Sequence, residues 1–148
     1  MSVKRRKFGV LEASDMERLV LDTFALMVYF RNEPGVARVR ELLEAAARGE
    51  IEISMSLVNL GEILYITERR QGEEMTRQVL SLVDSLPIHI AEATRKRVLG
   101  AAHFKAMYPI SYADAFAAAL AEELGATLLT GDPEFKALAG RIAIEWLM

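Results

Sequence analysis

The sequence alternates short apolar runs with longer stretches of helical periodicity along almost its whole length. Apolar runs suited to buried strands occupy residues 19–22, 51–54, 88–90, 126–130 and 142–147. Helical patterns fall between and around them, at residues 23–30, 35–48, 56–70, 75–86, 91–107, 111–124 and 133–138. This alternation predicts an α/β fold in which right-handed crossovers build a parallel sheet with helices on both faces.

The length of 148 residues suits one domain with a single core, and 52% hydrophobic with 26% charged residues is typical of a folded soluble protein. The absence of cysteine excludes disulfides, thiolate metal sites and cysteine nucleophiles, and it favours a reducing cytoplasm. A net charge of -3 argues against a broad basic surface for nucleic acid, so any such role must be local. The longest apolar run, residues 24–30, is too short for a membrane span.

Residues 1–17 differ from the rest of the chain, because they are first basic and then acidic and add no core periodicity. The basic run at residues 4–7 is not followed by the apolar segment of a signal peptide. We therefore expect residues 1–17 to be a peripheral extension or an over-long start, and residues 18–148 to form the domain. Removing the residues before Met16 is expected to leave folding and activity intact.

Two acids follow predicted strands: Asp22 ends the first, and Asp132 lies just past the fourth. Open parallel sheets bind ligands outside the carboxyl ends of their strands, so acids at these positions are candidates for a site. Each also has a purely structural interpretation. Asp22 suits the N-cap of the following helix, and the sequence Gly131-Asp132-Pro133 is ordinary turn and helix-start chemistry.

Two further acids lie on predicted helices. Ser111 and Asp114 have the spacing of a capping box, which by itself explains a carboxylate at a helix start. Glu62 is different, since it interrupts a helical stretch that otherwise looks half buried, where an unpaired carboxylate is costly and favours a partner or a metal. It could also lie at the rim of its helix.

Together, Asp22, Glu62, Asp114 and Asp132 predict a site for a hard divalent cation such as Mg²⁺ or Mn²⁺, which prefers oxygen ligands. Without the cation, mutual repulsion should raise the pKa values of these carboxyl groups. The neutral side chains beside the acids could orient ligands or metal-bound waters, although strand preference or capping explains the threonines as well. These neutral residues are Thr23, Asn59 and Thr130. His89 and His103 lack metal-ligand spacing and are expected to be structural or surface residues.

The signatures of dinucleotide-binding, P-loop and serine-hydrolase sites do not occur in the sequence. A haloacid-dehalogenase-type phosphatase would need a second acid two residues after Asp22, where Phe24 stands. A phospho-acceptor domain would need a lysine beyond a late strand, and Lys136, the one nearby candidate, falls inside a predicted helix.

Four motifs, in this order and spacing, resemble the PIN-domain family, and within it the VapC toxins of prokaryotic type II toxin-antitoxin modules. The resemblance spans residues 18–147 and its motifs are Leu21-Asp22-Thr23, Leu57-Val-Asn-Leu-Gly-Glu62-Ile-Leu, Ser111-Tyr-Ala-Asp114-Ala-Phe and Ala126-Thr-Leu-Leu-Thr-Gly-Asp132-Pro-Glu-Phe135. It implies a three-layer α/β/α sandwich with a mostly parallel five-stranded sheet. The sequence departs from the family pattern in its N-terminal segment and in Glu134, one more acid near the site.

The resemblance also implies an Mg²⁺- or Mn²⁺-dependent endoribonuclease that hydrolyses RNA phosphodiester bonds, forms a homodimer and is inhibited by a VapB-like antitoxin. Asp22, Glu62, Asp114 and Asp132 match the acidic quartet of the family, and Thr130 its accompanying hydroxyl residue. The alternative is a catalytically idle PIN-like module that binds RNA or protein; loss of a quartet acid would favour it, and none is lost. Cations would have to offset the acidic pocket for RNA, and candidates are Arg38, Arg40, Arg69, Arg70, Arg95, Lys96 and Arg97.

Overall fold

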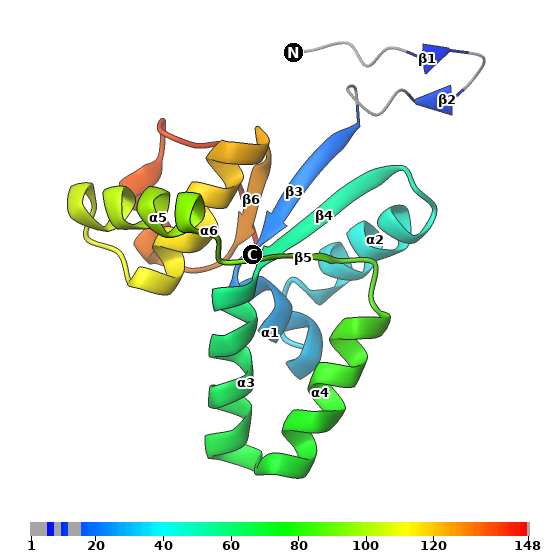
Figure 1. Ribbon diagram of the computed structural model, residues 1–148. Coiled ribbons are helices and arrows are strands. Elements are labelled where there is room, and N and C mark those ends of the chain that lie inside the picture. The colour runs from blue at the N-terminus through cyan, green and yellow to red at the C-terminus, as the bar shows by residue number, and fades with distance from the viewer. Residues whose placement is uncertain (1–5, 8–9, 12–15, 148) are drawn as a thin grey trace.

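A five-stranded sheet forms the centre of the molecule, in the order β5-β4-β3-β6-β7, with every neighbouring pair parallel (Figure 1). The computed structural model describes residues 6–7, 10–11 and 16–147. The strands are β3 (Glu17–Leu21), β4 (Ile51–Ser56), β5 (His89–Ala91), β6 (Thr127–Thr130) and β7 (Ile144–Trp146). The predicted five-stranded sheet is therefore confirmed.

Helices cover both faces of this sheet, which confirms the predicted α/β/α sandwich. In Figure 1, α5 and α6 lie on one side and α2 on the other, while α3 and α4 form a hairpin that extends past the carboxyl ends of the central strands. The helices are α1 (Thr23–Arg31), α2 (Val36–Ala47), α3 (Leu57–Gln71), α4 (Glu73–Ser85), α5 (Arg95–Met107), α6 (Tyr112–Leu124) and the 3₁₀ helix η2 (Pro133–Leu138).

One predicted helix boundary is wrong. The helix expected from residue 91 begins at Arg95, because Ala91 still belongs to β5 and pairs with Ser56. The hydroxyl of Thr94 then accepts a hydrogen bond from the amide of Arg97 and caps the first turn of α5. Ala91, at the start of the predicted segment, thus belongs to a strand rather than to a helix.

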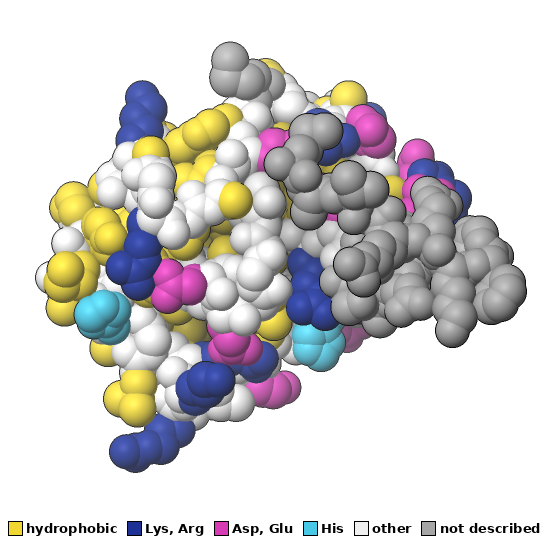
Figure 2. Space-filling model, turned by 90° about the horizontal axis from the view of Figure 1, so that it is seen from above, with side chains coloured by type: hydrophobic (Ala, Val, Ile, Leu, Met, Phe, Trp, Pro, Cys, Tyr) yellow, Lys and Arg dark blue, Asp and Glu magenta, His cyan; other side chains and the backbone are white. Residues whose placement is uncertain are grey.

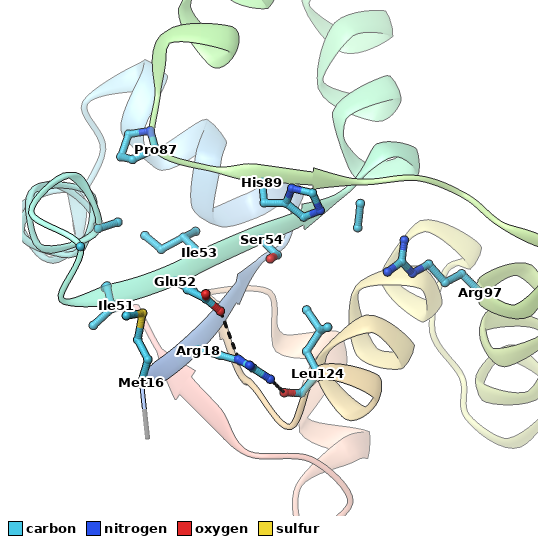
Figure 3. A pocket seen from close by; sticks show the side chains of 13 residues that line it. Met16, Arg18, Ile51, Glu52, Ile53, Ser54, Pro87, His89, Arg97 and Leu124 are labelled. Atoms are coloured by element: carbon cyan, nitrogen blue, oxygen red, sulfur yellow. Dashed lines mark hydrogen bonds and ion pairs between the residues drawn. The ribbon is translucent and has the colours of Figure 1, made fainter. Parts of the chain in front are cut away.

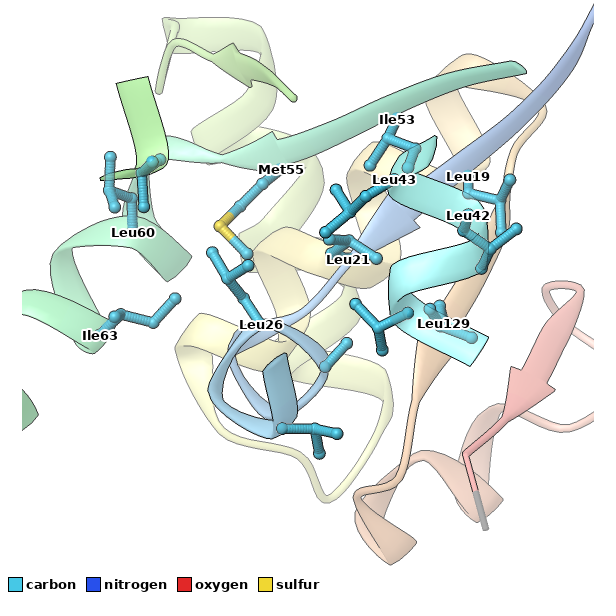
Figure 4. Close-up of a cluster of buried hydrophobic side chains, with 14 of the residues drawn as sticks. Leu19, Leu21, Leu26, Leu42, Leu43, Ile53, Met55, Leu60, Ile63 and Leu129 are labelled. Atoms are coloured by element: carbon cyan, nitrogen blue, oxygen red, sulfur yellow. The ribbon is translucent and has the colours of Figure 1, made fainter. Parts of the chain in front are cut away.

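The apolar residues of the central strands alternate between two packed layers. Leu19 and Leu21 of β3 join the cluster built with α1 to α4, as does Ile53 of β4 (Figure 4). Val20 points the other way and joins the cluster built with α5 and α6. Because both sides of the strand are covered there, the second half of β3, residues 19–21, is an unbroken apolar run that ends at Asp22.

The chain order creates a switch point at the centre of the sheet. The chain passes from β3 outward to β4 and β5, and then crosses to β6 on the other side of β3. Leu21 pairs with Leu129 in the β3–β6 register, so the residues that follow these two strands emerge side by side. Such a switch point opens a crevice at the carboxyl edge, where α/β proteins bind their ligands.

Outside the main sheet, β1 (Arg6–Lys7) pairs antiparallel with β2 (Val10–Leu11). The rest of the segment before Met16 lies outside the described residues, so its predicted role as a peripheral extension stays a prediction. Within the part that the structure describes, no helix combines the length and the apolar character needed to cross a membrane.

Candidate active site

Asp22 leaves β3 at the switch point and uses its two carboxylate oxygens for different partners. Oδ1 accepts a hydrogen bond from the amide of Ala25 at 2.8 Å, which makes Asp22 the N-cap of α1. Oδ2 accepts a hydrogen bond from the Thr130 hydroxyl at 2.5 Å. The side chain is only 1% exposed. Asp22 therefore caps a helix and also contributes to a polar cluster at the edge of the sheet.

Thr130 and Asp132 bring the end of β6 into the same cluster. The Thr130 hydroxyl accepts a hydrogen bond from the amide of Asp132 at 3.0 Å while it donates to Asp22. Oδ1 of Asp132 accepts from the amide of Glu134 at 2.9 Å, so the predicted capping role of Asp132 is confirmed at the start of η2. One hydroxyl group thus links the carboxylate after β3 to the backbone after β6.

Asp114 enters from the first turn of α6, and only 6% of it is exposed. The Ser111 hydroxyl accepts a hydrogen bond from the amide of Asp114 at 3.1 Å, as the predicted cap requires. Carboxylate oxygens of Asp114, Asp132 and Glu134 all lie within 4.8 Å of one another. Glu134, which the sequence marked only as one more nearby acid, is therefore a full member of the group.

Glu62 reaches this region from α3. It is half-buried and lines a cavity of about 250 Å³ together with Asp114 and Asp132. Asp22 is coupled to both of those acids through charge. All four predicted acids therefore lie at the carboxyl edge of the sheet. Asp22, Asp114 and Asp132 are close enough for their charges to interact, and Glu62 lies on the cavity wall.

Burial raises the pKa values of the two most enclosed acids. Together with the charge of Asp132, it raises the pKa of Asp22 to about 7, against the opposing effect of the hydrogen bonds from Thr130 and Ala25. Burial also raises the pKa of Asp114 to about 8, helped by its hydrogen bond with Glu134 and by the charges of Asp132 and Asp22. A cation would relieve this concentration of negative charge.

The donor set suits a hard divalent cation, because all of its charged groups are carboxylates. Mg²⁺ and Mn²⁺ take oxygen ligands from several elements and keep part of their water shell, so three or four converging carboxylates are enough. Asp114, Asp132 and Glu134 satisfy the spacing, and Asp22 and Glu62 lie at the same edge. The residues present therefore fit the predicted metal.

The three neutral side chains expected beside the acids have different partners. Thr130 contacts Asp22 directly. Asn59, however, donates to the Thr23 hydroxyl and to the carbonyl of Ala113, both at 3.2 Å, and its Oδ1 has no partner within the described part of the chain. Thr23 and Asn59 thus bind each other and the backbone of α6, and their predicted action on ligands or metal waters stays a prediction.

A larger cavity, about 640 Å³, lies elsewhere, near the amino ends of β3 and β4 (Figure 3). There Arg18 donates to Glu52 at 3.1 Å and to the carbonyl of Leu124 at 3.4 Å. His89 lines this cavity, and His103 lines another beside α5. Neither histidine lines the acidic cavity.

The further residues that line the acidic cavity include Phe24, Arg31 and Arg70. Of the cations considered from sequence, Arg70 alone faces this cavity, whereas Arg38 pairs with Glu145 in another part of the fold. Phe24 and Arg31 were missed. The one sequence feature that could have indicated them is their closeness to Asp22 in the chain, because both belong to the helix that Asp22 caps.

The fold and this edge define an α/β protein with an acidic, cation-attracting pocket at its switch point. The model of the PIN domain family matches residues 19–141, and the chain belongs to this family. No curated protein sequence matches the chain.

Solved structures show the same fold at low sequence identity. VapBC2 from Rickettsia felis, bound to a promoter DNA fragment, superposes with a TM-score of 0.71 at 20% identity over 88% of this chain and 99% of that one. DNA-bound VapBC from Salmonella typhimurium gives 0.69 at 22% identity over 88% and 98%. VapC20 from Mycobacterium tuberculosis, described as a Sarcin-Ricin loop cleaving toxin, gives 0.60 at 17% identity over 84% and 96%.

Proposed function

We propose that this chain is an Mg²⁺- or Mn²⁺-dependent endoribonuclease, a hydrolase of RNA phosphodiester bonds that acts as the VapC-type toxin of a toxin-antitoxin pair in the cytoplasm. The observation that carries the proposal is the convergence of Asp22, Asp114 and Asp132 from three separate elements, with Glu62 on the wall of the same cavity. Membership of the PIN family and the fold shared with VapC20 support the reaction class.

The carboxylates of Asp114, Asp132, Glu134, Asp22 and Glu62 would hold the cation or cations. Bound divalent ions lower the pKa of water and neutralise charge on a phosphodiester. The chain itself supplies preorganisation. The Thr130 hydroxyl fixes one oxygen of Asp22, and the amide of Glu134 fixes one oxygen of Asp132, so both carboxylates are oriented before substrate arrives.

The direct test is RNA cleavage by the purified protein with Mg²⁺ or Mn²⁺ and with EDTA. We expect cleavage only with metal, and we expect Asp114→Asn to lower kcat/KM by about a thousandfold or more while circular dichroism stays native. Asp84→Asn makes the same chemical change on the exposed surface of α4 and should retain wild-type activity. Metal-independent cleavage, or full activity in Asp114→Asn, would reject the assignment.

The partner is proposed to be a small VapB-like antitoxin, and the chain is proposed to be a homodimer. The similarity to VapBC complexes from two organisms supports this proposal. Expression in a bacterial host should arrest growth, Asp114→Asn should not, and co-expression of the protein encoded next to this chain's gene should restore growth. Light scattering of Asp114→Asn should give twice the chain mass of 16.5 kDa. A monomer, or harmless expression of active enzyme, would contradict these proposals.

A further inference from the structure

Phe24 is exposed in a helix that is otherwise anchored in the core. Its neighbours Thr23, Ala25 and Leu26 are buried, whereas 41% of the Phe24 side chain is accessible. The ring lines the acidic cavity together with Asp114 and Asp132. The exposed part of the ring is therefore accessible to a ligand that enters the cavity.

Gly131 fixes where the ring lies. A Cβ atom at position 131 would stand 2.2 Å from Cε1, 2.7 Å from Cζ and 2.9 Å from Cδ1 of Phe24. One edge of the ring therefore rests against the backbone between Thr130 and Asp132, directly beside the carboxylates. Any larger residue at 131 would have to displace the ring, so the glycine and the aromatic residue form a matched pair.

The same cavity carries two guanidinium groups. Arg31 makes a long ion pair with Glu33 at 3.9 Å, and both side chains are well exposed. Arg70 makes no ion pair with any other described residue. Guanidinium groups bind phosphate through paired N–H donors, whereas exposed aromatic rings bind nucleobases by stacking. One cavity thus combines carboxylates that suit a metal ion, an exposed aromatic ring and two guanidinium groups. The ring suits the base of a nucleotide, and the guanidinium groups suit its phosphates.

We propose that Phe24 is a substrate-binding residue, on which an unpaired nucleobase of the RNA stacks next to the phosphodiester held at the carboxylates, with Arg31 and Arg70 binding the neighbouring phosphates. This inference rests on the proposed ribonuclease function. The stacking contact is made by bound substrate in the ground state and the transition state alike, so it should affect KM more than kcat.

The test compares Phe24→Ala, Phe24→Leu and Phe24→Tyr on an unstructured RNA oligonucleotide with Mg²⁺. We expect Phe24→Ala and Phe24→Leu to raise KM by about tenfold with kcat within about twofold, and Phe24→Tyr to behave like wild type because it keeps the ring. Tyr65→Ala is the control, since Tyr65 is also an exposed aromatic residue but stacks on Arg69 outside the cavity. Equal KM values for Phe24→Leu, Phe24→Tyr and wild type would overturn the proposal.

Gly131→Ala gives an independent arm. It should raise KM like Phe24→Ala by pushing the ring aside, and it should add nothing in the Phe24→Ala background, because the two changes act on one contact. Additive losses would overturn the ring-positioning role of Gly131.

Binding separates this inference from the nuclease itself. In the Asp114→Asn background with Mg²⁺, fluorescence anisotropy of the labelled oligonucleotide should show about tenfold weaker binding after Phe24→Ala. If the wild type cleaves no RNA but this loss of binding is seen, the hydrolytic proposal fails and the stacking site stands. If cleavage is normal and RNA binding ignores Phe24, stacking is rejected, and loss of antitoxin binding in that variant would assign Phe24 to the protein partner.

Discussion

Thr130 contacts two acidic residues through one hydroxyl group. It donates to the carboxylate of Asp22 and accepts from the amide of Asp132, and it is completely buried. A buried hydroxyl with both a donor and an acceptor role cannot be replaced by an apolar group of the same shape without leaving its partners unsatisfied. This residue therefore contributes to the stability of the fold and to the orientation of the acids.

Thr130→Val tests that dual role. The variant keeps the volume but leaves the amide of Asp132 and one oxygen of Asp22 without their partner, so the free energy of unfolding should fall by about 1–3 kcal/mol. Metal-dependent cleavage should fall with it, by at least tenfold, because Asp22 is no longer held. Thr130→Ser retains the hydroxyl and should keep most of both properties. Chemical denaturation and steady-state kinetics measure the two effects, and wild-type behaviour of Thr130→Val would contradict this account.

At the scale of elements, Asn59 of α3 connects helices that carry different acids. Its Nδ2 donates to Thr23 at the start of α1 and to the carbonyl of Ala113 in the first turn of α6. Glu62 lies less than one turn farther along α3, and Asp114 directly follows Ala113. Asn59 thereby sets the spacing between the starts of three helices that surround the acidic cavity.

We expect Asn59→Ala to lower the free energy of unfolding by about 1–3 kcal/mol, since it removes the hydrogen bonds to the buried Thr23 hydroxyl and to the part-buried carbonyl of Ala113. Activity should fall as well, because α3 and α6 lose their connection beside Glu62 and Asp114. Glu68→Ala changes an exposed residue of the same helix and should stay within about 0.5 kcal/mol of wild type. Urea denaturation measures the difference, and an Asn59→Ala variant as stable as Glu68→Ala would refute the connecting role.

The order and type of the elements could be predicted because apolar periodicity directly reflects burial. Leu19 to Leu21 are buried from two sides, which gives an unbroken apolar run. The start of α5 was misplaced, since Ala91 suits a helix and a buried strand equally well. Capping at Ser111 and at Asp132 was predictable, because it depends only on neighbours along the chain.

The composition of the acidic group was less accessible from sequence. Glu134 joins Asp114 only because η2 turns it back toward the start of α6, a contact between segments about twenty residues apart in the chain. The contact of Phe24 with Gly131 likewise depends on β3 and β6 being neighbours in the sheet. Local patterns carry no record of such pairings, whereas the four acids could be grouped through the strand-end rule and the family resemblance.

At the scale of the whole molecule, ion pairs join many of the charged side chains that the structure describes. On the face seen in Figure 2, basic side chains lie next to acidic ones. Two of the ion pairs among the described residues join Arg18 to Glu52 and Arg97 to Glu123. With a net charge of -3, long-range attraction of RNA is weak. Local cations and bound metal must therefore provide most of the attraction at the acidic cavity.

The raised pKa values of Asp22 and Asp114 link the stability of the entire fold to pH and to metal. In EDTA, both carboxyl groups hold protons in the folded state up to about pH 7 and pH 8, whereas the unfolded chain releases them near pH 4. The folded state therefore binds more protons in this window, and the melting temperature should fall as pH rises from 5 to 8.

Mg²⁺ competes with those protons for the same oxygens and binds only the folded state, so its stabilising effect should be small at pH 5 and grow toward pH 8. Differential scanning fluorimetry with EDTA and with Mg²⁺ across this range measures both trends. Asp22→Asn removes one titrating group and should flatten the EDTA trend, while Asp84→Asn should not. If Mg²⁺ raises the melting temperature by the same amount at pH 5 and at pH 8, the enclosed carboxyl groups are not the ones that bind the ion.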